Sequence, residues 1–201
     1  MPRLNISSVF CDPYNQAYHA VEYLLENKRA NIAFISERSD SSPFYEKRMK
    51  GYQAAMQHYF HDTNALAAEI DFFREKTPES DKAIEADICS FLDKHPDATS
   101  IITTNLAIVQ IYKHLIKKQV PPGKYTILVF DSAERMDFIP YQNLIIIDQC
   151  PYKIGYLAAE QLHLQITQHA TLQNIDVPER FVAHKSNSTD ISPITSINIQ
   201  E

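Results

Sequence analysis

The chain contains 201 residues, of which 44% are hydrophobic and 22% are charged, a composition typical of a globular protein that can bury its own core. No apolar run approaches the ~18 residues needed to span a membrane, and the N-terminus lacks the uninterrupted apolar core of a secretory signal, so we expect a cytoplasmic protein with no membrane partner. The formal net charge of −6 argues against a broad basic surface, so the chain by itself is a poor candidate for binding DNA.

Short runs of apolar, β-branched residues alternate along the chain with longer segments of helical period. In chain order we predict strand 7–10, helix 14–26, strand 31–35, helix 43–59, strand 68–72, helix 78–93, strand 100–103, helix 105–118, strand 126–130, strand 144–147, helix 152–169 and strand 180–184. This alternation is typical of a parallel sheet with crossover helices. Runs such as TILVF contain four large apolar residues in succession, which indicates strands buried on both faces. The predicted fold class is therefore α/β with a doubly wound parallel sheet.

Several polar residues follow the predicted strands. Ligands bind at the carboxyl ends of the strands in open parallel sheets, and this edge would carry Asp12, Ser36 to Arg38, Asn105, Asp131 and Asp148. Asp12 and Asn105 can also be explained as caps of the helices that follow them. Asp131 is harder to explain by capping, because the apolar strand before it places its carboxylate at the mouth of the sheet. We therefore expect a binding site at this edge.

Arg48 lies close to the apolar stripe of the helix predicted over 43–59, where a guanidinium group needs a partner. One explanation is that its stem packs on the stripe while its head reaches solvent. The other is that Arg48 donates into the same pocket in which Asp131 accepts. With Asn105 and a nearby aromatic residue, Phe72, these groups would supply acceptors, donors and an apolar face, which suits a polar ring ligand.

Patterns that indicate catalysis, metals or cofactors are weak. The three glycines lie too far apart for a GxGxxG or GxxxxGK[ST] phosphate loop, and no GxSxG nucleophile elbow occurs. His58 and His61 form an HxxH pair without a third ligand at a recognisable spacing, which is more typical of a solvated helix end than of a metal site. We therefore predict no catalytic residue, no metal site and no cofactor. An α/β enzyme that uses Asp131 or Cys11 is kept as an alternative.

An ordered series of segments resembles the effector-binding domain of the lac repressor/gal repressor (LacI/GalR) family of transcription regulators. EKRMKGYQAAM is similar to the family signature R-L-x-G-[FWY]-x-x-A and aligns Arg48 with the effector-binding arginine. IDFF resembles G-D-[WF], whose aromatic residue stacks on the effector, and thereby implicates Phe72. ITTNLAIVQIYKHL aligns Asn105 with a position that contacts the effector, and PPGKYTILVFDS aligns Asp131 with the ligand-binding aspartate. VFCDPYNQAYHAVEYLL resembles the first strand, acidic turn and helix, and adds Asp12 as a weaker candidate.

The resemblance implies the periplasmic-binding-protein type I fold and a division of the chain. Residues 1–186 would form the effector-binding domain, in which 7–148 and 179–186 make one full subdomain and 149–172 are a remnant of the other. The polar tail 187–201 is expected to be flexible. Part of the remnant's apolar face would lack its usual partner, so we expect reduced stability or association.

The function implied by the resemblance is that of a non-catalytic effector-binding module. A small molecule, either a sugar or a nucleobase-like compound, would bind between two subdomains and shift their closure. The family resemblance also implies a homodimer, and DNA would be contacted only through a head domain that is absent from this chain. The alternative outside transcription is a periplasmic-type solute-binding protein of the same fold.

Overall fold

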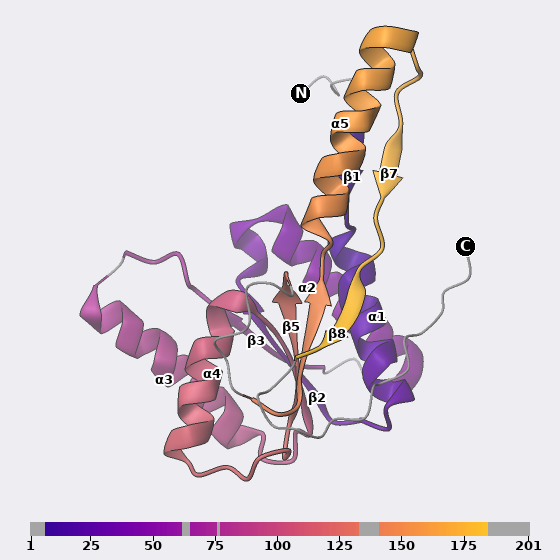
Figure 1. Ribbon diagram of the computed structural model, residues 1–201. Coiled ribbons are helices and arrows are strands. Elements are labelled where there is room, and N and C mark those ends of the chain that lie inside the picture. The colour runs from indigo at the N-terminus through magenta and orange to yellow at the C-terminus, as the bar shows by residue number, and fades with distance from the viewer. Residues whose placement is uncertain (1–6, 62–64, 76, 133–140, 185–201) are drawn as a thin grey trace.

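A six-stranded sheet forms the centre of the main body (Figure 1). The structure is a computed structural model and describes residues 7–61, 65–75, 77–132 and 141–184; the tail predicted to be flexible lies outside these ranges. In spatial order the sheet contains β3 (Leu66–Ile70), β2 (Ile32–Glu37), β4 (Ser100–Thr104), β5 (Thr126–Asp131), β6 (Leu144–Asp148) and β8 (Arg180–Ala183). The first five strands are parallel, and β8 runs antiparallel to β6 at the edge.

Helices cover both faces of this sheet. One face packs against α1 (Pro13–Glu26) and α2 (Pro43–Phe60), and the other packs against α3 (Pro78–Lys94) and α4 (Asn105–Lys117). Neighbouring strand residues divide between the two cores, because successive side chains in a strand point to opposite faces. Phe34 and Leu128 lie in the α1/α2 core, whereas Ile35 and Val129 lie in the α3/α4 core. The doubly wound α/β fold predicted from the alternating segments is confirmed.

The helices begin where short polar side chains satisfy the first backbone N–H groups. Asp12 Oδ1 accepts from the backbone N–H of Tyr14 at 2.8 Å, and Ser42 accepts at the start of α2. At the start of α3, Thr77 and Ser80 form a reciprocal capping box. A proline occupies the first position of each of these helices, where its missing N–H has no cost. The local sequence thus fixes where α1, α2 and α3 begin.

The tyrosine that follows Gly51 ties α2 to the sheet. The Tyr52 ring is fully buried and stacks on Phe34, with ring centroids 4.9 Å apart. Its hydroxyl donates to the backbone carbonyls of Ile32 at 2.9 Å and Leu66 at 3.1 Å. This one side chain therefore fixes α2 against both β2 and β3. A short 3₁₀ turn, η1 (Ser39–Ser41), connects β2 to α2.

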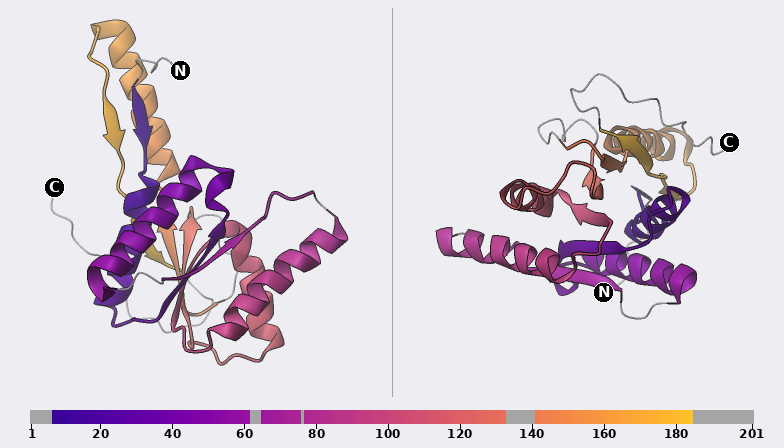
Figure 2. Two further views of the ribbon diagram at one scale, coloured as in Figure 1. Left: turned by 180° about the vertical axis from the view of Figure 1, so that it is seen from behind. Right: turned by 90° about the horizontal axis from the view of Figure 1, so that it is seen from below.

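An arm projects from the main body and consists of α5 (Pro151–Gln168), β1 (Ser8–Phe10) and β7 (Asn174–Asp176) (Figures 1 and 2). β1 and β7 pair in parallel and form a separate two-stranded sheet. No residue of α5 is buried. Its exposed apolar side chains are Tyr152, Tyr156, Leu162 and Ile166. As the sequence indicated, the arm presents an uncovered apolar face. None of the described helices is long and apolar enough to cross a membrane.

The first strand lies in the arm and not in the main sheet. The expected subdomain over 7–148 placed residues 7–10 with the main sheet, but β1 pairs with β7 instead. The reason is that β7 offers a parallel partner at the arm, where Ser8 also donates from its hydroxyl to Asn174 at 2.7 Å. β7 was not predicted, because the sequence NID contains only one apolar residue.

Candidate ligand-binding site

A cavity of about 460 Å³ opens at the carboxyl ends of the strands. It lies at the ends of β2 and β5 and beside the first turns of α2, α4 and α5. The residues that line it are Glu37, Phe44, Tyr45, Arg48, Asn105, Phe130, Asp131, Ser132, Gln149 and Pro151. Three of the five residues proposed from the sequence, Arg48, Asn105 and Asp131, are therefore brought together. The volume falls in the range of small-molecule sites.

Arg48 is buried in this cavity, with only 3% of its surface exposed. Its guanidinium carbon lies 4.3 Å from the centre of the Phe44 ring and 4.0 Å from that of Phe130. Nη2 donates to Gln16 Oε1 at 3.3 Å, while Nε has no hydrogen-bond partner among the described residues. Burial lowers the pKa of Arg48 to about 10, against the opposing effects of Glu37 and Asp131. The side chain is therefore not a solvated surface arginine. It keeps its charge at neutral pH, and its Nε–H has no acceptor among the described residues.

The two other predicted residues in the cavity lie at the carboxyl ends of the adjacent strands β4 and β5. Asp131 is the last residue of β5 and is buried, and one of its carboxylate oxygens accepts from the backbone N–H of Ser132 at 2.7 Å. Asn105 is the first residue of α4 and is partly exposed. The residue in the capping position of α4 is Thr104, so Asn105 is not used as a cap. Its side chain lines the cavity instead.

Glu37 also lines the cavity and was not singled out from the sequence. It belongs to the polar segment noted after the second predicted strand, but β2 extends through it and buries it to 1% exposure. Thr104 and Ser36 each donate a hydroxyl hydrogen bond to its carboxylate, at 2.8 and 3.3 Å. A charged residue directly following NIAFIS was the available signal, and its burial could not be inferred because charged residues rarely continue a buried strand.

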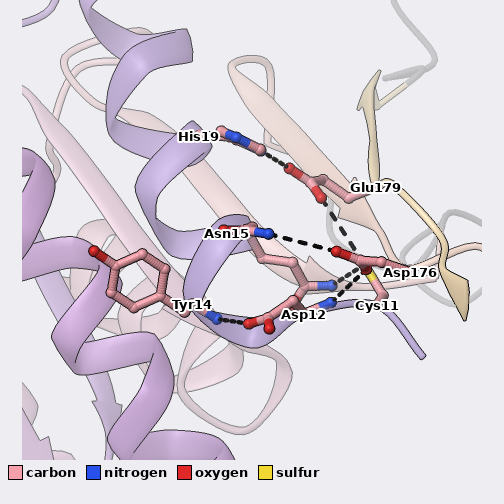
Figure 3. Close-up of polar contacts among 8 residues, drawn as sticks. Cys11, Asp12, Tyr14, Asn15, His19, Asp176 and Glu179 are labelled. Atoms are coloured by element: carbon pink, nitrogen blue, oxygen red, sulfur yellow. Dashed lines mark hydrogen bonds and ion pairs between the residues drawn. The ribbon is translucent and has the colours of Figure 1, made fainter. Parts of the chain in front are cut away.

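Phe72 and Asp12 do not line the cavity. Phe72 follows β3 and packs against the core on the α3/α4 face of the sheet. Asp12 caps α1, and its carboxylate lies 3.8 Å from Lys47. Its backbone N–H donates to Asp176 at 3.1 Å (Figure 3). The capping explanation for Asp12 is therefore observed, and ligand contact by either residue stays a prediction.

The arm joins the main body through a cluster of polar contacts between α1 and the segment from β7 to β8 (Figure 3). Asn15 donates to Asp176 at 3.4 Å, and His19 Nδ1 lies 2.7 Å from Glu179 Oε1. The hydrogen bond with Glu179 raises the pKa of His19, and burial acts in the opposite direction. These contacts fix where the arm meets α1.

A buried chain of side chains connects Arg48 to this junction. Gln16, which accepts from Arg48, is fully buried and donates from Nε2 to Cys11 Sγ at 2.8 Å. Cys11 Sγ in turn lies 3.9 Å from Glu179 Oε2. A continuous series of side-chain contacts thus connects the cavity to the base of the arm. Burial raises the pKa of the Cys11 thiol to about 12, which does not suit a nucleophile.

The cavity carries the groups of a binding site. It contains two acids, one arginine, the two amides of Asn105 and Gln149, and aromatic faces, which can fix the orientation of a polar ligand. Within the described ranges, no group of three or more metal-binding side chains occurs. The cysteine kept as a possible nucleophile lies outside the lining of the cavity.

No family model matches the sequence. The chain is similar to catabolite control protein A of Priestia megaterium, with 26% identity over 173 residues that cover 85% of the chain and 49% of the relative. It therefore spans about half the length of this curated relative.

Solved structures of transcription regulators share the fold. A LacI family transcriptional regulator from Enterococcus faecium with bound ribose superposes with a TM-score of 0.72 at 19% identity, covering 92% of the chain and 67% of that structure. A complex of the transcriptional regulator CelR with cellobiose superposes with a TM-score of 0.68 at 20% identity, covering 93% and 56%. These proteins are regulators, not enzymes. The resemblance indicated by the ordered motifs is confirmed: the chain has the fold of the effector-binding domain of LacI-type transcription regulators.

Proposed function

We propose that the cavity binds a small polyhydroxyl effector, and that the chain is the effector-binding part of a LacI-type transcription regulator. The observation that carries this proposal is the buried environment of Arg48 in the cavity. This arginine is buried between two aromatic rings, has an Nε without a hydrogen-bond partner among the described residues, and shares the cavity with Asp131 and Asn105. A buried donor without a partner costs free energy, and a ligand oxygen would supply the missing acceptor.

The distribution of donors and acceptors favours a sugar over a nucleobase-like ring. Asp131 and Glu37 can each accept from ligand hydroxyls, while Arg48 and Asn105 can donate to ligand oxygens. Phe44 and Tyr45 add apolar surface to the same wall, suited to the C–H face of a sugar ring. The ribose and cellobiose bound by the similar regulators support the same choice.

The regulatory setting is part of the proposal. We place the main body as one complete subdomain and the arm as part of a second, so that an effector at the cavity would change how the two are held. The junction of Figure 3 would carry that change, because buried side chains link Arg48 to Cys11 and Glu179. Homodimer formation, DNA contact through other parts of the full-length regulator, and a cytoplasmic location follow from the same proposal.

A thermal-shift screen of the chain tests the binding step. The panel contains ribose, glucose, cellobiose and a set of nucleobases. A ligand at 100 times its dissociation constant stabilises a folded protein by about 2.7 kcal/mol, which raises the melting temperature of a chain this size by roughly 5–10 °C. Asp131→Asn should abolish the shift, while Asp87→Asn, an exposed residue on α3 outside the cavity, should retain it.

The results of this screen can support the proposal, contradict it, or change the class of effector. Stabilisation by a sugar that Asp131→Asn removes supports the proposal. No stabilisation by any compound contradicts it, as does a shift that survives in Asp131→Asn and in Arg48→Met. A nucleobase that stabilises the chain would keep the site and change the class of effector.

A further inference from the structure

Glu37 gives the cavity a second buried carboxylate, and the family motifs assign it no role. It ends β2, is 1% exposed and lines the cavity beside Arg48 and Asp131. The groups that hold it are neutral: Thr104 donates to Oε1 and Ser36 donates to Oε2. Within the part of the chain that the structure describes, no ion pair involves Glu37. The carboxylate is therefore fixed in position without a directly paired cation.

Arg48 lies in the same cavity but does not form an ion pair with Glu37. The arginine is held by the rings of Phe44 and Phe130 and by Gln16, and it forms no ion pair among the described residues. An acceptor and a donor thus line one cavity without contacting each other. A ligand hydroxyl can accept from Arg48 Nε, and a hydroxyl or amino group can donate to Glu37.

We propose that Glu37 determines the specificity of the cavity: it accepts a hydrogen bond from a hydroxyl or amino group of the effector, and it excludes effectors that carry a phosphate or carboxylate at that point. The inference rests on the proposed function, since it concerns the same cavity. In addition, it states which charge the effector carries next to Glu37 and names Glu37 as the residue that selects for this charge.

The physical reason is the burial of the carboxylate. Salt and water screen a charge poorly when it is only 1% exposed, so an incoming anion is repelled. The anion also brings no hydrogen to donate, and a buried acceptor without a donor loses binding energy. A hydroxyl or an ammonium group meets neither obstacle. Discrimination against the wrong partner through such a repulsive contact is a general route to specificity.

The test compares neutral sugars with an amino sugar and with phosphorylated sugars. The chain is titrated calorimetrically with glucose, glucosamine and glucose 6-phosphate, and with ribose and ribose 5-phosphate. We expect each neutral sugar that binds to do so at least about tenfold more tightly than its phosphorylated form, and glucosamine to exceed glucose 6-phosphate by at least as much, since a hydrogen bond to a charged group is worth roughly tenfold or more. Glu37→Gln, which keeps the shape and removes the charge, should reduce this ratio by about tenfold.

Two further variants make the result specific to Glu37. Glu160→Gln changes an exposed glutamate on α5 outside the cavity and should leave the ratio unchanged. Thr104→Val removes the hydroxyl that holds Glu37, and should lower the ratio in the same direction as Glu37→Gln. Because Thr104 makes no side-chain capping bond, this variant keeps the start of α4.

The outcomes distinguish this inference from the proposed function. A wild-type chain that binds a phosphorylated sugar as tightly as its neutral form overturns the role of Glu37 and leaves the sugar site in place. An unchanged ratio in Glu37→Gln does the same. If no compound binds the wild-type chain, the proposed function fails and this inference fails with it. If Glu37→Gln does not fold, the wild-type ratio and Thr104→Val decide.

Discussion

Gly51→Ala should destabilise the fold, because the backbone of α1 packs directly against this glycine of α2. A Cβ atom built on Gly51 would lie 2.1 Å from the carbonyl oxygen of Tyr14 and 2.9 Å from its carbonyl carbon. Both of these are backbone atoms in the first turn of α1, so no side-chain rotation can relieve the clash. The start of α1 would have to retreat by about 1 Å, since real Cβ contacts rarely fall below 3.0 Å.

Two opposing effects set the size of this change. An alanine in the interior of a helix is favoured over glycine by roughly 0.5–1 kcal/mol. Overpacking a tight contact costs typically 1–3 kcal/mol, with the upper end applying where backbone must move. The net loss should therefore be about 2 kcal/mol. At roughly 2–4 °C for each kcal/mol in a chain of this size, the melting temperature should fall by about 4–8 °C.

Gly155→Ala provides the matched control. Gly155 also lies inside a helix, α5, but a Cβ atom built on it would meet nothing within 4 Å. This variant should keep or slightly increase stability, because only the helix preference changes. Urea unfolding followed by circular dichroism measures both variants against wild type. A Gly51→Ala chain as stable as wild type would refute the close packing of α1 on α2.

Three more expectations follow from the structure. Thr77→Ala removes half of the capping box with Ser80 at the start of α3, and should lower the free energy of unfolding by about 1 kcal/mol in a urea titration. The contact with Glu179 raises the pKa of His19 above 6.5, so its contribution to stability is fully present below pH 6.5 and is lost as pH rises through the raised value. Melting curves across this range should therefore show a steeper loss for wild type than for His19→Gln, and identical slopes would contradict the pairing. Burial raises the pKa of Cys11 to about 12, so alkylation followed by mass spectrometry should modify it only after unfolding, and rapid labelling in the native chain would contradict this burial.

The main sheet could be predicted from the sequence because its strands are buried on both faces. Runs such as 126–130 carry four consecutive large apolar residues after a single threonine, and pattern and structure agree within a few residues at each end. β7 escaped prediction for the opposite reason. Its three residues carry no periodic signal, and the strand exists only because β1 provides a partner from the far end of the chain.

The candidate site could be predicted where a side chain's position follows from its own strand or helix. Asp131 ends an apolar strand, and Arg48 lies on a helix that faces the same edge, so both were placed by local reasoning. Glu37 depended on hydroxyl donors from Ser36 and from Thr104 on the neighbouring strand, and that long-range pairing cannot be read from local pattern. Phe72 was proposed from a motif, but after the turn that follows β3 its side chain packs against the core on the α3/α4 face of the sheet.

The cavity at the strand ends is proposed to bind a small hydroxyl-rich effector. Amide chemical-shift mapping by NMR, with the sugar that most stabilises the chain as the probe, tests it most directly. We expect the largest shifts at Arg48, Asn105 and Ser132, around the cavity, with smaller shifts at the junction near Cys11. Shifts confined to α5, or spread evenly over the surface, would contradict it.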